Sequence, residues 1–206
     1  MSVTSDVDEL RWETPTGWAD AVLVDEVALL DDHAHLEREA ARNALNLMTR
    51  VPRGVDPGRW TARLNGVARD EVAHLGTVLT ELADRGAQLS VGHANPYARG
   101  LRELVRRGDA VGELVDRLLV SALIELRSCE RFRLLGATGH ELAPLYARLE
   151  ASEAGHHRLF VQLAAQADDD ARVAARWGEL LDAEAEVARA QPPGPRLHSG
   201  VGPAVR

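Results

Sequence analysis

Apolar periodicity that is interrupted by acidic residues is the feature that most constrains how this chain can fold. Four segments, at about residues 19–49, 59–85, 111–135 and 141–167, carry apolar side chains three and four positions apart. This spacing places those side chains on one face of an α-helix. The apolar face of each segment also contains one glutamate, and these are Glu37, Glu71, Glu125 and Glu153. We therefore expect each long helix to place a carboxylate in its own buried seam.

The first segment illustrates the pattern. Its expected buried positions are Val27, Leu30, Ala34, Ala41, Leu45 and Met48. Glu37 lies one turn after Ala34 and one turn before Ala41, on the side that should be dry. Glu39, in contrast, lies about 200° around the helix from Glu37, towards solvent.

The segments between these helices contain the residues that end helices. "VPRGVDPG", "GHANPYARG" and "GATGH" separate the four long segments, and a shorter amphipathic segment lies near "YARGLRELVRR". A last helix is expected at about 169–190, and no segment shows the alternation of a strand. The sequence predicts an all-α four-helix bundle with additional short helices, formed by residues 1–190 as a single domain. The Pro/Gly-rich tail, residues 191–206, is expected to be disordered.

Composition excludes several classes of protein. The formal net charge is -8, which argues against a general nucleic-acid binder. Cys129 is the single cysteine, so no disulfide can form within the chain, as is usual in a reducing compartment. The sequence shows no signal peptide and no apolar run of about 18 residues. We expect a cytoplasmic protein without a membrane partner, either a monomer or a small homo-oligomer.

Four buried carboxylates need compensation. Burying one unpaired carboxylate costs several kcal/mol, on the order of the net stability of a small domain. Arginines occupy too few seam positions to neutralise four of them, whereas two divalent cations bring four positive charges. The sequence therefore predicts a dinuclear metal centre.

The seams also carry histidines at one recurring spacing. Glu71 and His74 form one Glu-x-x-His motif, and Glu153 and His156 form a second. Residues three apart on a helix project from the same side, so both can reach one metal. Alone, either motif is more often a solvated ion pair, but two copies on apolar seams favour metal binding. The expected ligands are Glu37, Glu71, His74, Glu125, Glu153 and His156, the set known from di-iron carboxylate bundles. Oxygen and imidazole donors suit Fe(II) or Mn(II).

Five blocks of the chain, taken in order, resemble blocks of a known protein family. They read "PTGWADAVLVDEVALLDDHAHLEREAARNALNLM", "ARDEVAHLGTVL", "ANPYARGLRELVR", "ALIELRSCERFRLL" and "LEASEAGHHRLF". Over about residues 14–166 they resemble the tRNA hydroxylase family called MiaE. The most specific pieces are "DH" before Glu37, "RSCERF" after Glu125 and "SEAGH" in the last block.

The resemblance implies a ferritin-like fold with a non-haem centre of two iron ions. It implies an O2-dependent monooxygenase that hydroxylates the isopentenyl group of 2-methylthio-N6-isopentenyladenosine in tRNA. O2 would be the co-substrate and tRNA the substrate. An electron-donating reductase would be a partner, since the chain has no flavin or nicotinamide motif. The same six residues would be the metal ligands. Two alternatives are a di-iron oxygenase acting on a small molecule and a non-catalytic ferritin-like iron-binding protein.

A few residues outside the ligand set have weaker expectations. Arg127 and Ser128 could orient the ligand carboxylates from behind. The only basic cluster contains Arg99, Arg102, Arg106 and Arg107. As a solvated helix face it needs no function, and the less favoured alternative is that it contacts the phosphates of tRNA.

Overall fold

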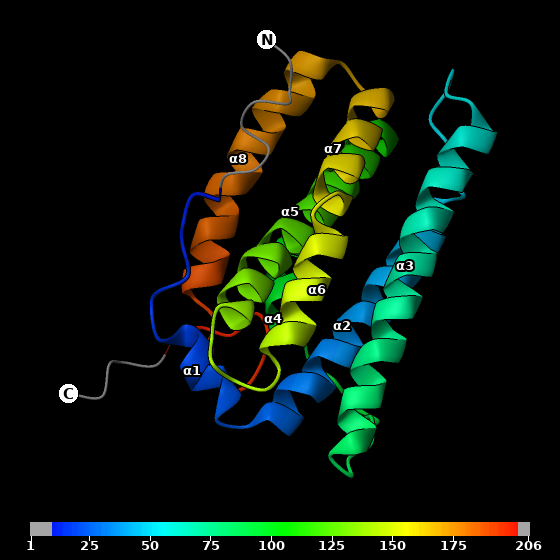
Figure 1. The fold of residues 1–206 in the computed structure, drawn as a ribbon. Helices are drawn as coiled ribbons and strands as arrows, with labels where there is room; N and C mark the ends of the chain where they lie inside the picture. Colours follow the sequence, from blue (N-terminus) through cyan, green and yellow to red (C-terminus); the bar gives the residue numbers. More distant parts are fainter. Residues whose placement is uncertain (1–9, 202–206) are drawn as a thin grey trace. The chain divides into compact units, whose positions relative to one another are not determined.

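The computed structural model describes residues 10–201 and is almost entirely helical (Figure 1). These residues form two compact units. We call residues 20–94 and 195–197 the α2–α3 unit, and residues 10–19, 95–194 and 198–201 the α4–α8 unit. The described part of the chain has no β-strand, only an isolated bridge between Pro193 and Gly200. The all-α prediction is confirmed.

The α2–α3 unit consists mainly of two long helices. Helix α1 covers Trp18–Leu23, α2 covers Glu26–Leu47 and α3 covers Pro57–Asp84. Helices α2 and α3 lie side by side in Figure 1. Asp56 starts α3, because its side chain accepts a hydrogen bond from the backbone N–H of Arg59 at 2.6 Å and Pro57 follows it.

The α4–α8 unit is arranged around one long helix. Its helices are α4 (Pro96–Glu103), α5 (Ala110–Gly136), α6 (Ala143–Glu153), α7 (His156–Ala167) and α8 (Asp170–Arg189). Helix α5 contacts the four others in this unit. This central position explains why α5 is buried on most sides. Asp109 and Asp169 cap the first turns of α5 and α8 with their carboxylates.

Two of the predicted long helices are interrupted. The segment predicted at 19–49 breaks between α1 and α2, where Asp25 accepts a hydrogen bond from the backbone N–H of Ala28 at 3.0 Å. The segment predicted at 141–167 begins at Ala143 and breaks at residues 154–155, between α6 and α7. Apolar periodicity continues across both breaks, so it could not reveal them.

The seam of α2 also differs in part from its prediction. Leu30, Ala34 and Ala41 are buried, but Val27 is 37% exposed and Leu45 is 50% exposed. Ala44 and Leu47 take the place of Leu45 and Met48 in the buried face. This small rotation leaves Glu37 on the buried face.

The start of the C-terminal tail is tightly packed, which differs from the expected disorder. In the α2–α3 unit, the backbone N–H of Leu197 donates to Asp32 at 2.9 Å. In the α4–α8 unit, the His198 ring stacks on Tyr97 and the Ser199 hydroxyl accepts from the Trp18 indole at 3.3 Å. Residues 202–206 of the predicted tail lie outside the described residues. That residues 1–190 act as a single domain stays a prediction.

The length and polarity of the helices show whether any of them could cross a membrane. Between residues 10 and 201, no helix has both the length and the apolar character that a membrane crossing requires.

Candidate metal centre

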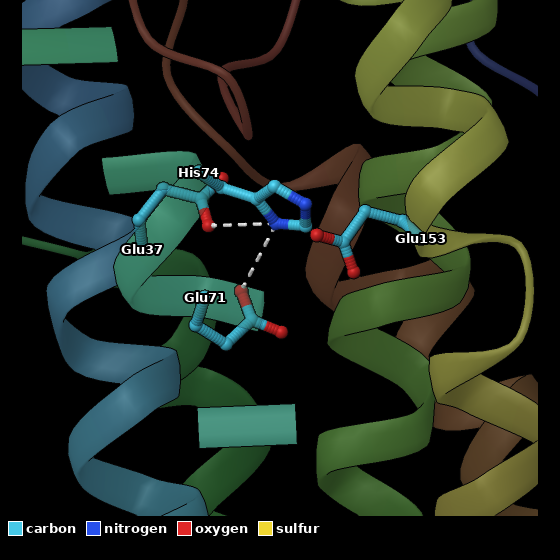
Figure 2. Close-up of side chains that lie close together, drawn as sticks. All are labelled: Glu37, Glu71, His74 and Glu153. Atoms are coloured by element: carbon cyan, nitrogen blue, oxygen red, sulfur yellow. Dashed lines mark ion pairs between the residues drawn. The ribbon is translucent and has the colours of Figure 1, made fainter. Parts of the chain in front are cut away.

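One cluster of predicted ligands lies in the α2–α3 unit. Glu37 comes from α2, and Glu71 and His74 come from α3. Each offers a ligand atom within 4.8 Å of the other two. His74 Nδ1 lies 3.8 Å from Glu37 Oε2 and 3.9 Å from Glu71 Oε2, as the dashed lines in Figure 2 show. All three are buried, so the i, i+3 motif on α3 does direct both of its side chains inward, towards Glu37.

His33 forms a hydrogen bond with one carboxylate of this cluster. Its Nε2 lies 2.6 Å from Glu37 Oε1, one helical turn away on α2. Burial, together with the nearby His74 ring, lowers the pKa of His33 from 6.5 to about 3. The ring is therefore neutral at pH 7. Because an ionised carboxylate only accepts hydrogen bonds, we assign the Nε2 proton as the one donated to Glu37.

The second cluster of predicted ligands lies in the α4–α8 unit. Glu125 comes from α5, Glu153 is the last residue of α6, and His156 is the first residue of α7. Their ligand atoms again lie within 4.8 Å of one another, and His156 Nδ1 contacts Glu153 Oε2. All three are buried. The motif was predicted on one continuous helix, but a two-residue interruption separates its members.

The donors in both clusters fit iron. Each cluster offers two carboxylates and one imidazole, and neither contains a thiolate. Oxygen and imidazole donors suit Fe(II) and Mn(II). The clusters are buried and acidic, which is costly unless a cation compensates them. The burial predicted for all six residues is confirmed.

Arg127 and Ser128 have other partners than those expected. The Arg127 guanidinium donates two hydrogen bonds to Glu184, at 2.9 and 2.8 Å, and one to Glu130 at 2.7 Å. Ser128 Oγ lies 3.2 Å from His198 Nε2. None of these partners is a predicted ligand. In the sequence His33 flanks the seam four residues before Glu37, which left a surface role and a supporting role open, and its hydrogen bond to Glu37 favours the supporting role.

Two arginines, Arg127 and Arg131, are buried in the α4–α8 unit. Arg127 pairs with Glu184 and Glu130, while Arg131 lies with its guanidinium 4.1 Å from the centre of the Trp18 ring. These cations are matched to Glu130 and Glu184. They therefore leave the charge of Glu125 and Glu153 to be compensated in another way.

The basic cluster lies on α4 and in the loop that follows it. Arg99, Arg102, Arg106 and Arg107 are all exposed. Arg106 differs from the others because it pairs with the fully buried Asp116 on α5. Cys129, on α5, is mostly buried, and burial together with nearby Glu125 raises the pKa of its thiol, which suits packing rather than nucleophilic chemistry.

A comparison with protein families assigns the chain. The model of the family described as tRNA-(MS[2]IO[6]A)-hydroxylase (MiaE) matches residues 2–199. The chain belongs to the MiaE family. The family resemblance predicted from the sequence is thereby confirmed, and so is the prediction of a hydroxylase.

Two relatives named as tRNA hydroxylases are similar over most of the chain. The tRNA 2-(methylsulfanyl)-N(6)-isopentenyladenosine(37) hydroxylase of Pseudomonas putida is 39% identical over 98% of this chain and 97% of its own length. The enzyme of the same name from Salmonella typhimurium is 30% identical over 82% of this chain and 61% of its own length.

A solved structure shares the fold. It is described as Protein 43 with aldehyde deformylating oxygenase activity from Synechococcus. It matches with a TM-score of 0.84 and 31% identity, over 96% of this chain and 98% of its own. The predicted ferritin-like fold class is confirmed. A buried carboxylate and histidine set in such a fold is compatible with a di-iron site.

Proposed function

We propose that this MiaE chain is a non-haem di-iron monooxygenase that hydroxylates the isopentenyl group of 2-methylthio-N6-isopentenyladenosine in tRNA. The family match over residues 2–199 carries this proposal. The Pseudomonas putida relative, whose name states this substrate, supports it through 39% identity over nearly the full length of both chains.

Six residues would hold two iron ions. Glu37, Glu71 and His74 would supply ligands from the α2–α3 unit. Glu125, Glu153 and His156 would supply ligands from the α4–α8 unit. Within each cluster the donor atoms lie within 4.8 Å of one another, a separation from which they can bind a shared ion. The set reproduces the ligand pattern of di-iron carboxylate bundles, a glutamate from two helices and Glu-x-x-His from the other two. Here the second of those helices is the interrupted α6–α7 pair.

The iron pair would supply O2 activation, which amino-acid side chains cannot perform. The balanced reaction takes a C–H bond, O2, two electrons and two protons, and yields a C–OH group and water. The electrons would come from a separate reductase, with tRNA as the other partner.

The chain's own residues would hold and shield this chemistry. His33 would keep Glu37 oriented by donating its Nε2 proton to the carboxylate. Buried apolar residues on the same helices as the ligands, such as Leu30 and Ala34 on α2 and Ala122 on α5, would exclude water and competing reactions.

Mass spectrometry of tRNA nucleosides tests the proposal directly. A host that lacks the gene should lose the isopentenyladenosine derivative that carries one extra oxygen atom, and a plasmid copy should restore it. A nucleoside profile that does not change with the gene would refute the tRNA substrate.

A small-molecule oxygenase is the second candidate. The solved structure with aldehyde deformylating oxygenase activity favours it, since it shares this fold at 31% identity. Purified chain loaded with Fe(II) and given reductant would then consume O2 with an aldehyde or a free nucleoside but not with tRNA. A non-catalytic iron-binding protein would take up iron without turnover of any of them.

A further inference from the structure

We propose that Arg99 and Arg107 form a docking surface for the phosphate backbone of an RNA substrate. This inference rests on the proposed function, because only a nucleic-acid substrate brings a phosphate backbone to the enzyme. It assigns the recognition of the polynucleotide to a site apart from the predicted metal ligands.

The charge of this segment is opposite to that of the chain. Residues 99–107 contain four arginines and one glutamate, which gives a net charge of +3, against -8 for the whole protein. An acidic protein repels RNA over most of its surface, so a local basic segment can determine where the RNA binds. Arginine suits this role because its planar guanidinium can pair with a phosphate through two hydrogen bonds.

The packing of α4 fixes which of its residues face solvent. Tyr97, Ala98 and Leu101 are buried within the α4–α8 unit. Gly100 lies so close to α8 that a Cβ there would be 3.0 Å from a methyl group of Val187. With these residues turned inward, the remaining face of the helix, which carries Arg99 and Arg102, is exposed.

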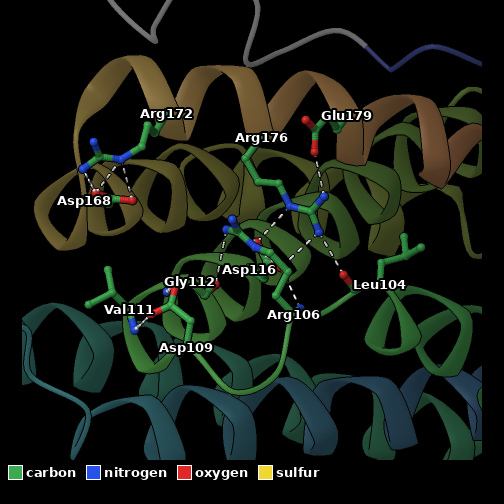
Figure 3. A network of polar contacts seen from close by, with 10 residues as sticks. All are labelled: Leu104, Arg106, Asp109, Val111, Gly112, Asp116, Asp168, Arg172, Arg176 and Glu179. Carbon is green, nitrogen blue, oxygen red and sulfur yellow. Dashed lines mark hydrogen bonds and ion pairs between the residues drawn. The ribbon is translucent and has the colours of Figure 1, made fainter.

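A buried carboxylate holds the loop after α4 (Figure 3). The backbone N–H of Arg106 donates to Asp116 at 2.8 Å, and its guanidinium donates to both oxygens of Asp116, at 3.0 and 2.8 Å. Arg176 of α8 also bonds to Asp116 and to the backbone oxygen of Leu104. Arg106 is thus occupied as an anchor, and we exclude it from the docking surface.

The contact between Arg106 and Asp116 fixes the backbone next to Arg107. Arg107 is exposed, and it directly precedes Gly108, whose φ of 88° is a conformation that glycine adopts readily. A loop that is already ordered loses less conformational entropy when it binds a ligand. Arg107 is therefore ready to contact a phosphate without a large rearrangement.

Helix α5 connects this surface to the predicted metal ligands. Asp116 and Glu125 are nine residues apart on the same helix. At a rise of 1.5 Å per residue, they are separated by about 14 Å along its axis. RNA held by its phosphates at the anchored loop would therefore be kept at a set position along α5, within reach of the ligand-bearing part of this helix.

The test compares two pairs of charge reversals in the full-length, iron-loaded protein. The first is Arg99→Glu with Arg107→Glu. The second, matched in charge, is Arg53→Glu with Arg59→Glu, two exposed arginines of the α2–α3 unit. The probe is fluorescently labelled tRNA that carries the isopentenyladenosine derivative, and fluorescence anisotropy gives its Kd over a range of salt concentrations.

We expect the first pair to raise the Kd at least tenfold. It should also reduce the slope of log K against log salt by about 2, because each substituted arginine would otherwise neutralise one phosphate. The control pair should change both quantities far less. The neutral pair Arg99→Gln with Arg107→Gln should show the same direction of change, and circular dichroism should show native helix content for every variant.

The outcomes separate the two proposals. If the wild type hydroxylates tRNA and both charge-reversed pairs bind it equally well, the docking surface is wrong and the function stands. If the wild type neither binds nor hydroxylates tRNA, the tRNA function itself fails, and the docking surface fails with it.

Discussion

At the scale of single residues, charge burial is the dominant feature of this chain. Glu37, Glu71, Glu125 and Glu153 are each at most 6% exposed. Buried ionised carboxylates persist in proteins when cations or hydrogen bonds compensate them. Glu130 and Glu184 have Arg127 as their partner, whereas the four seam glutamates lie beside histidines. The chain thus keeps its structural ion pairs separate from its candidate metal ligands.

Loss of a ligand should remove the metal. We expect Glu125→Ala and His156→Ala each to abolish most iron binding and all hydroxylation, because each removes a donor that no neighbour replaces. Iron per chain, measured by elemental analysis after reconstitution, checks this. Glu150→Ala, one turn before Glu153 on α6, serves as a control that should keep its iron. Full iron content in either ligand variant would contradict the assignment.

His33 should matter for metal affinity without being a ligand. Removing a side chain that orients a ligand typically weakens metal binding about 10- to 100-fold. We expect His33→Ala to have an effect of that size on Fe(II) affinity, measured by competition with a chelator. His35→Ala is a matched control, since His35 is also buried on α2 but bonds to Ser90 at 3.0 Å. Equal affinities for the two variants would refute this role.

His93 should make stability depend on pH. Hydrogen bonds to Asp32 and Glu39 raise the pKa of His93 to about 9, and its ring stacks on that of His35. The folded state therefore keeps a proton that the unfolded state has lost above its pKa of 6.5. This contribution is complete below about pH 6.5 and is lost as the pH rises through 9.

The measurement is the free energy of urea-induced unfolding at several pH values. Between pH 6.5 and 9 it should fall more steeply for the wild type than for His93→Gln. Parallel curves for the two proteins would show that His93 does not titrate in this way.

At the scale of helices, the two Glu-x-x-His motifs differ in whether their helix is continuous. Helix α3 is continuous through Glu71 and His74, while the equivalent motif is divided between the end of α6 and the start of α7. Gly155 lies in that interruption, and a Cβ built there would meet no atom within 4 Å, so close contact does not require a glycine at this position. The two motifs therefore offer the same pair of residue types, one from a continuous helix and the other from an interrupted helix.

Asp116 should be important for stability, because it joins the loop after α4 to α5 and α8. Removing one partner from a buried ion pair costs about 3 kcal/mol or more, and the partial exposure of Arg106 places this site at the lower end. We expect Asp116→Asn to lower the free energy of unfolding by about 2–3 kcal/mol. Asp168→Asn, which removes an ion pair with the exposed Arg172, should cost less than about 1 kcal/mol. Similar losses of stability in both variants would contradict this view.

At the scale of the whole molecule, residues 197–200 are packed into the structure. Leu197, His198 and Ser199 are all buried. Gly200 passes so close to Gln191 that a Cβ would lie 2.0 Å from its backbone oxygen. Only glycine allows this approach, and the proline-rich sequence around it gave no indication of burial.

Truncation tests the importance of this segment. A chain that ends at Gly194 lacks the buried Leu197 side chain and the hydrogen bonds to Asp32, Ser128 and Trp18. Full burial of one leucine alone contributes about 2 kcal/mol, so we expect a decrease of at least that size in the free energy of unfolding. A chain that ends at Val201 keeps all of these interactions and should match the wild type. Equal stability of the two would show that the segment contributes nothing.

The sequence by itself determined the helical class, the family and the burial of six candidate ligands. All of these depend on spacing along one helix or on blocks of adjacent residues, which are local properties. Only the tertiary structure decided the breaks beside Asp25 and Gly155, the support of Glu37 by His33, the Arg127–Glu184 pair and the packing of residues 197–199. The ion pair and the tail interactions join residues far apart in the chain, so no local pattern encodes them. The apolar periodicity continues across both breaks and therefore does not reveal them.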